Sequence, residues 1–248
     1  MPARVREKQP PAPLTLRGTP LRASIGCGMP VRTRVKICGI RRPEDAVAAA
    51  RAGADAIGLV FYPRAPRHVS LEMAREILDA LPAFVTPVGL FVDADADELL
   101  RTVKTLGLRH VQLNGRETPD DVAKLSTLAV VKSVAVDDAI AETLAAWKAA
   151  GLKNLKGLVL ETAGTGQAGG SGVANDWQRV VESRSRGLFD GLPPLISAGG
   201  LTPESVGPVV RAVRPYAVDV SSGVEESRGI KSANRIEAFV AAVREADR

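Results

Sequence analysis

The sequence predicts an α/β fold, a single closed (β/α)8 barrel, or TIM barrel. A unit made of a short apolar strand and a following helix repeats eight times over about 215 residues that begin near Arg34, which is the size and rhythm of this barrel. The chain has 248 residues, of which 45% are hydrophobic and 25% charged, as is typical of globular proteins. No interior stretch resembles a linker, so one domain is expected over residues 33–248.

The elements follow from local signals. The first strand is expected at 35–38, and Pro43, a good first-turn residue, opens a helix that ends at Gly53. The second strand is expected at 56–61, and Ser70 caps the next helix. Further strands are expected at 85–92, 110–113, 129–136, 155–160, 194–197 and 216–221, and further helices at 97–106, 118–125, 138–150, 176–183, from 202, and at 233–246. The structural alternative for these units is a doubly wound open sheet.

Residues 1–32 are rich in Pro and Arg and lack apolar periodicity, so they are expected to be a disordered basic extension. The first 28 residues hold five of the 33 basic side chains and one of the 28 acidic ones. The body is therefore nearly neutral, and no nucleic-acid partner is expected. The extension is open to two other interpretations, an organelle transit peptide or an upstream start chosen in error before Met29.

Several classes of protein are excluded by composition. No apolar run approaches the roughly 20 residues that span a bilayer, so no membrane partner is expected. The two cysteines, Cys27 and Cys38, make no disulfide framework, which favours a cytoplasmic protein. The two histidines, His68 and His110, come without clustered cysteines, so no metal site is expected.

Alternation along the strands indicates what fills the barrel. Lys36 and Cys38 share one strand face, because side chains point to opposite sides in turn. Facing inward with them, we expect Gln112, Asn114, Lys132, Val159, Glu161 and Asp219. Buried charges are tolerated only when paired, so either Lys36 or Lys132 should pair with Asp219. For Lys132 we expect a purely structural role.

Two residues at strand ends are candidates for proton transfer, because active sites of this barrel lie where the strands end. Cys38 stands beside Lys36, and a nearby positive charge favours thiolate over thiol. The alternative is that Cys38 is a small core residue. Glu161 ends the sixth strand, and a carboxyl that faces a thiol across the barrel mouth makes an acid and a base.

Glycine-rich turns predict a phosphate site. Turns at 197–200 and 221–223 follow the last two strands, where this fold recurrently binds phosphate, and a third lies at 169–172. Glycine lets backbone N–H groups close on an anion, and serine adds hydroxyl donors. The expected phosphate-binding residues are Gly170, Gly199, Gly200, Ser221, Ser222 and Gly223. The alternative is a set of ordinary turn glycines.

Two arginines follow the second strand. Arg64 and Arg67 lie on one loop, and an arginine there is suited to hold a carboxylate in a two-pronged hydrogen bond. For Arg64 a solvated loop position is favoured.

Seven segments resemble the phosphoribosylanthranilate isomerase family, in order and from about Arg34 to the C-terminus. They are RVKICGI at 34–40, GADAIGLVFY at 53–62, PRHVS at 66–70, VQLNG at 111–115, GGSG at 169–172, SAGGL at 197–201 and VDVSSGVE at 218–225. The resemblance implies a cofactor-free Amadori rearrangement in tryptophan biosynthesis. In it, N-(5-phospho-β-D-ribosyl)anthranilate becomes 1-(2-carboxyphenylamino)-1-deoxyribulose 5-phosphate. It further implies a small-molecule substrate, and we expect a monomer or a homodimer.

The resemblance also implies roles for single residues. Cys38 is the base, Glu161 occupies the position of the acid, and Arg67 binds the anthranilate carboxylate. Asp219 and Asn114 are expected to bind substrate. Two departures stand out, since the family usually has aspartate where Glu161 stands and commonly histidine where Asn114 stands. Glutamate reaches one methylene further, and asparagine donates a hydrogen bond but does not titrate.

Two other functions remain open. One is a different phosphosugar barrel, such as the sugar-isomerase step of histidine synthesis. Such enzymes are expected to use aspartate where Cys38 stands and to carry a second phosphate site in the first half of the chain. The other is a barrel that has lost catalysis and only binds a phosphorylated ligand, for which Glu161 and Asn114 are the supporting features.

Overall fold

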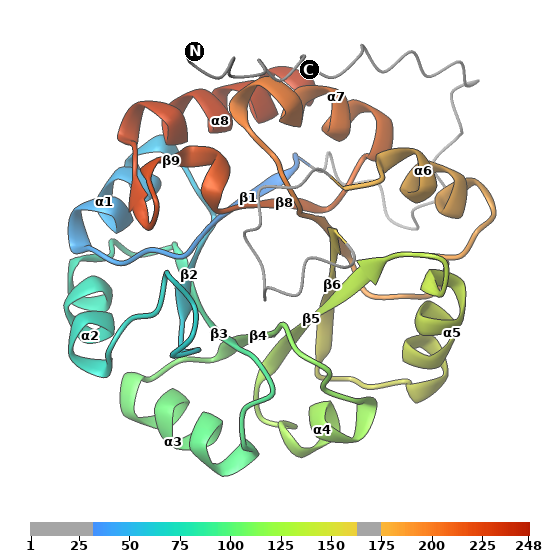
Figure 1. Cartoon of the computed structure of the whole chain (residues 1–248), viewed down its shortest axis with the longest axis horizontal. Helices are drawn as coiled ribbons and strands as arrows, with labels where there is room; N and C mark the ends of the chain where they lie inside the picture. Colours follow the sequence, from blue (N-terminus) through green and yellow to red (C-terminus); the bar gives the residue numbers. More distant parts are fainter. Residues whose placement is uncertain (1–31, 163–174) are drawn as a thin grey trace, which may run out of the picture.

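The computed structural model describes residues 32–162 and 175–248. In this part of the chain, eight parallel strands close into a barrel in sequence order, with β8 hydrogen-bonded to β1 (Figure 1). The strands are β1 (Arg34–Cys38), β2 (Ala56–Val60), β3 (Thr86–Phe91), β4 (His110–Leu113), β5 (Ala129–Val136), β6 (Leu155–Thr162), β7 (Leu195–Ser197) and β8 (Ala217–Val220). The closed ring confirms the predicted TIM barrel and excludes the open sheet.

Helices surround this barrel on the outside (Figure 1). They are α1 (Pro43–Ala52), α2 (Leu71–Ala80), α3 (Ala96–Leu106), α4 (Pro119–Lys124), α5 (Ile140–Ala150), α6 (Trp177–Ser185), α7 (Pro203–Val213) and α8 (Ala233–Ala246). The predicted local signals are present. Pro43 starts α1, Gly53 ends it with φ of 91°, and the Ser70 hydroxyl accepts the backbone N–H of Met73 at the start of α2.

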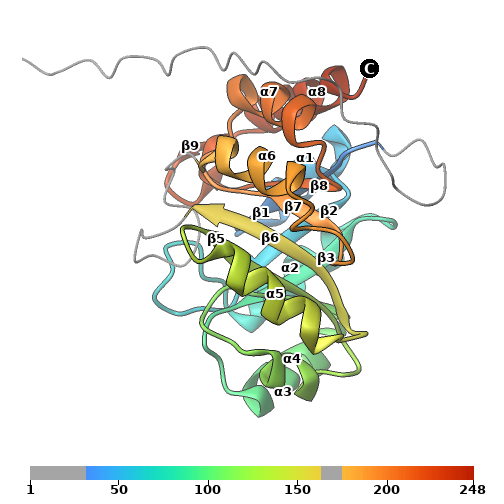
Figure 2. The ribbon, with the colours of Figure 1, turned by 90° about the vertical axis from the view of Figure 1, so that its right-hand side faces the viewer.

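The connection from β8 to α8 holds elements that the sequence did not predict. A short 3-10 helix, η1 (Ser222–Val224), is followed by an antiparallel pair, β9 (Glu225–Ser227) and β10 (Ile230–Lys231). Figure 2 shows β9 at the end of the barrel toward which the β6 arrow points. Elements of two or three residues are too short to leave a periodic pattern. They lie at the strand ends, where this fold places its sites.

The register of β5 corrects one expectation, because Lys132 does not face into the barrel. Lys132 pairs with Leu158, and Ser133 pairs with Val159. Leu158 belongs to the hydrophobic core that includes residues of the surrounding helices, so Lys132 faces the helices and Ser133 faces the interior. The strand reads AVVKSVAV, with apolar residues on both faces, and such a strand does not reveal its phase.

Some expectations concern residues outside the described ranges. These are most of the extension over 1–32 and the turn at 169–172 with Gly170. Arg32, placed by the sequence in the extension, donates from Nη1 to Asp55 Oδ2 at 2.9 Å. Over residues 32–162 and 175–248, no helix is both long and apolar enough to cross a membrane.

Candidate active site

A buried ion pair joins the first and last strands of the barrel. Lys36 and Asp219 are register partners on β1 and β8, and both are almost completely buried. Lys36 Nζ lies 3.0 and 2.9 Å from the two carboxylate oxygens. Burial opposes the charge of Lys36, but Asp219 and Cys38 more than offset it, so the pKa of Lys36 lies above its ordinary value. Of the two pairings considered for Asp219, the one with Lys36 is confirmed.

Cys38 lies directly beside this pair. A Cβ on Gly58 would come within 2.8 Å of Cys38 Sγ and 3.2 Å of Lys36 Nζ, so the thiol and the ammonium share the space that a side chain would fill. Burial raises the pKa of the Cys38 thiol, while Lys36 lowers it. The expectation that Lys36 favours the thiolate has the correct sign, but burial is the larger effect.

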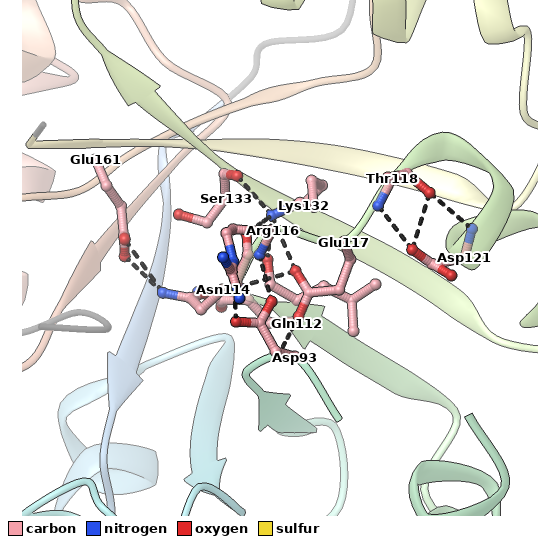
Figure 3. Close-up of polar contacts among 12 residues, drawn as sticks. Asp93, Gln112, Asn114, Arg116, Glu117, Thr118, Asp121, Lys132, Ser133 and Glu161 are labelled. Carbon is pink, nitrogen blue, oxygen red and sulfur yellow. Dashed lines mark hydrogen bonds and ion pairs between the residues drawn. The ribbon is translucent and has the colours of Figure 1, made fainter. Parts of the chain in front are cut away.

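Glu161 is held by groups from the two preceding strands. Asn114 Nδ2 lies 3.1 Å from both Glu161 Oε1 and Oε2 (Figure 3). The Ser133 side chain, inward-facing on β5, also favours the ionised form of this carboxyl. Burial raises the pKa of Glu161 above its ordinary value, and the hydrogen bonds from Ser133 and Asn114 oppose that rise. A carboxyl with a raised pKa retains a proton that it can give to a substrate.

One electrostatic environment surrounds both candidate groups. Lys36 and Asp219 act on the titration of Cys38 and on that of Glu161. Cys38 and Glu161 both lie on inward-facing positions near the carboxyl ends of β1 and β6, so the thiol and the carboxyl face the same interior as the ion pair. The arrangement fits a base and an acid that serve one ligand.

Arg67 lies beside the strand that ends in Cys38, and it is already paired. Its Nε and Nη2 donate to the two oxygens of Glu225 at 2.7 and 2.9 Å. A Cβ on Gly39 would come within 3.2 Å of Arg67 Cβ, so the arginine stem packs on the residue after Cys38. Arg67 Nη1 has no hydrogen-bond partner within residues 32–162 and 175–248. Arg64 is exposed, as its solvated interpretation requires.

Sequence reasoning missed Glu225 and Lys231. Lys231 Nζ is fully buried and lies 2.9 Å from Glu225 Oε1 and 3.0 Å from the Ser221 carbonyl. Burial raises the pKa of Glu225, but Arg67 and Lys231 outweigh it and leave that pKa below its ordinary value. Lys231 also lowers the pKa of Cys38. The charged network therefore continues from the mouth into the β9–β10 hairpin.

The two glycine-rich turns after β7 and β8 lie against each other. Gly199 and Gly200 have φ of 93° and 63°, which side chains rarely adopt. A Cβ on Gly223 would overlap the Leu201 carbonyl oxygen, so the two turns pack backbone to backbone. Between residues the structure describes, no hydrogen bond uses the N–H of Gly200, Ser222 or Gly223. These donors are suited to an anion.

Comparison with known proteins gives the family. Residues 35–242 match the family described as N-(5'phosphoribosyl)anthranilate (PRA) isomerase. The chain belongs to this isomerase family. Its eight-stranded barrel and its cysteine at the end of β1 agree with the segments that first indicated the resemblance.

Relatives match the isomerase over nearly their whole length. The N-(5'-phosphoribosyl)anthranilate isomerase of Pseudomonas fluorescens is 47% identical over 213 residues, which is 85% of this chain and 95% of the relative. The solved Thermotoga maritima structure has 35% identity and a TM-score of 0.75, covering 86% of this chain and 99% of its own. Another solved structure, with the same identity and coverage and a TM-score of 0.73, is a complex with reduced 1-(o-carboxyphenylamino)-1-deoxyribulose 5-phosphate.

Proposed function

We propose that this isomerase converts N-(5'-phosphoribosyl)anthranilate into 1-(2-carboxyphenylamino)-1-deoxyribulose 5-phosphate, with Cys38 as base and Glu161 as acid. The observation that carries the proposal is that Cys38, beside the Lys36–Asp219 pair, and Glu161, bound by Asn114, both face the barrel interior near the ends of their strands. A thiol and a carboxyl suffice for this rearrangement, which moves protons and exchanges no electrons with a cofactor.

The first step opens the sugar ring. Protonated Glu161 gives its proton to the furanose ring oxygen, and the bond between that oxygen and C1 breaks. The anilino nitrogen lone pair forms the C1–N double bond, which yields a Schiff base. Burial prepares this step, because it raises the pKa of Glu161 and so favours the protonated carboxyl before the substrate reacts.

The second step moves a proton from carbon. The Cys38 thiolate takes the proton on C2, the C–H electrons form the C1–C2 double bond, and the C1–N pair returns to nitrogen. The enolamine then becomes the ketone when the enol proton is lost and C1 gains one. Lys36 and Lys231 support the thiolate, since each lowers the pKa of Cys38.

The binding groups fit the two ends of this substrate. The N–H groups of Gly200, Ser222 and Gly223, which have no acceptor among the described residues, are assigned to the phosphate, with Gly199 shaping the turn and the Ser221 hydroxyl beside it.

The other end of the substrate is aromatic and carries a carboxylate. The Nη1 of Arg67 is assigned to that carboxylate. The small apolar cluster of Cys38, Val60 and Leu90 offers a wall for the ring. The Asp219 carboxylate has roughly four positions that can accept a hydrogen bond, and Lys36 Nζ occupies two of them. The remaining positions are assigned to a ribose hydroxyl of the substrate.

The test is growth and turnover. The chain should restore growth without tryptophan to a bacterium that lacks this isomerase, and the purified protein should convert N-(5'-phosphoribosyl)anthranilate but not the substrate of the histidine-pathway isomerase. Turnover of the histidine-pathway substrate alone would replace the proposal, and binding without any turnover would favour a ligand-binding barrel. The enzyme is proposed to act in the cytoplasm as a monomer or a homodimer, which sedimentation velocity distinguishes.

A further inference from the structure

The backbone on both sides of Asn114 is held in place by hydrogen bonds from one buried lysine. Lys132 lies on the helix-facing side of β5 and donates from Nζ to the carbonyls of Leu113 at 3.2 Å and Gly115 at 2.8 Å. These are the residues before and after Asn114 in the chain. A third bond runs from Lys132 Nζ to the Ser133 carbonyl at 3.0 Å. One buried ammonium thus fixes the end of β4 to β5.

Glu117 completes this clamp. Its carboxylate lies 3.1 Å from Lys132 Nζ and accepts the backbone N–H groups of Gly115 at 2.8 Å and Asp93 at 2.9 Å. The Lys132 and Glu117 side chains are 4% and 7% exposed. A buried pair whose remaining donors and acceptors are also satisfied is rigid, because any shift breaks several bonds at once.

The Asn114 side chain is oriented by a further contact. Gln112 Nε2 donates to Asn114 Oδ1 at 2.7 Å, and Gln112 is 1% exposed. Because the amide oxygen is engaged there, the amide NH2 group must point the other way. It points to Glu161, and it reaches both carboxylate oxygens at 3.1 Å.

We propose that Asn114 is the positioning residue for Glu161, and that Lys132 and Glu117 hold Asn114 in place from the helix side of the sheet. The inference rests on the proposed function, in which Glu161 is the acid. A side-chain carboxyl near the end of a strand can rotate, and a hydrogen bond from a fixed amide removes that freedom. About 1 Å of misplacement of a catalytic group can cost about a hundredfold in rate. The clamp thereby links a structural ion pair to the proton donor.

Other side chains also act on the Glu161 carboxyl, so a test of Asn114 must leave these residues unsubstituted. Ser133 from β5 donates a hydrogen bond, Asp219 from β8 disfavours ionisation, and Lys36 from β1 favours it. Asn114 from β4 favours ionisation through its hydrogen bonds. Removing only the Asn114 amide should therefore raise the pKa of Glu161.

The experiment compares Asn114→Leu with Asn154→Leu in the full-length protein. Asn154 is a matched control, because its Nδ2 also donates two bonds, to the carbonyls of Val122 at 2.8 Å and Leu125 at 3.1 Å. It precedes β6, at the opposite end of that strand from Glu161. Two quantities are measured, the Glu161 titration by NMR with carbon-labelled glutamate and the pH dependence of kcat/KM.

Asn114→Leu should raise the Glu161 titration midpoint, shift the acid limb of kcat/KM the same way, and lower kcat about 10- to 100-fold. Asn154→Leu should change neither the Glu161 titration midpoint nor the acid limb of kcat/KM. If Asn114→Leu unfolds, Asn114→Asp provides an isosteric test and should raise the midpoint as well. An unchanged midpoint in a folded Asn114 variant overturns the inference. Absence of wild-type turnover would overturn the proposed function instead, and the NMR titration would still decide whether Asn114 controls Glu161.

Discussion

Lys36 Nζ lies 2.9 Å from Asp219 Oδ2, and this buried pair joins β1 to β8 where the barrel closes. The same two residues act on the titration of Cys38 and Glu161. This one contact therefore contributes both to the closure of the fold and to the chemistry of the site. A change to either residue should be visible both in the stability of the protein and in its proton transfers.

Replacement of Lys36 by methionine should destabilise the fold. It leaves the Asp219 carboxylate buried without its cation, and breaking a buried pair from one side costs about 3–5 kcal/mol. The free energy of unfolding in urea measures the effect. Lys36→Met combined with Asp219→Asn should recover much of the loss, because no unpaired charge remains. A single variant as stable as the wild type would show that the pair contributes nothing.

Replacement of Glu161 by glutamine removes the proton but keeps the shape and the contact with Asn114. We expect kcat to fall by about a hundredfold or more, since general acid catalysis typically contributes 10²–10⁴. The melting temperature should change little, because the amide can still accept a hydrogen bond from Asn114. A Glu161→Gln enzyme that works at the wild-type rate would remove Glu161 from the scheme.

The pH dependence of kcat/KM should be bell-shaped. The pair of Cys38 and Glu161 must share one proton, so activity falls when both are protonated at low pH and when neither is at high pH. Burial raises both pKa values, which places the acid limb above the ordinary carboxyl value of 4.5 and the alkaline limb above the ordinary thiol value of 9.0. An acid limb at or below 4.5 would contradict the burial of Glu161.

Arg67 and Arg64 allow a matched test of carboxylate binding on one loop. Arg67→Gln should raise KM about 10- to 100-fold, since a hydrogen bond to a charged group contributes about 1.5–3 kcal/mol. Arg64→Gln should leave KM unchanged, because Arg64 is exposed. Steady-state kinetics of the two variants gives the comparison. Equal KM values would show that Arg67 serves only Glu225.

Much of the site follows from the sequence, because strand alternation and strand ends are local properties. The inward placement of Cys38, the pairing of Lys36 with Asp219 and the turns at 197–200 and 221–223 were all predicted from them. The side of the sheet on which Lys132 lies was not, because a strand that is apolar on both faces has no marked phase.

Other parts of the network depend on contacts between distant residues. Glu225 reaches Arg67 across 158 positions of the chain, and Asn114 reaches Glu161 across 47. Lys231 lies on a two-residue strand. Neither propensity nor periodicity encodes such contacts. The departures at Asn114 and Glu161, which looked independent in the sequence, lie in direct contact.

The rate of N-(5'-phosphoribosyl)anthranilate conversion by Cys38→Ala, measured beside the wild type, tests the central claim most directly. We expect an active wild type and a folded variant whose rate is lower by about a hundredfold or more, because alanine has no group that can take the C2 proton. Circular dichroism and the melting temperature establish that the variant is folded. A folded Cys38→Ala enzyme that retains more than about a hundredth of the wild-type rate would contradict the assignment of Cys38 as the base.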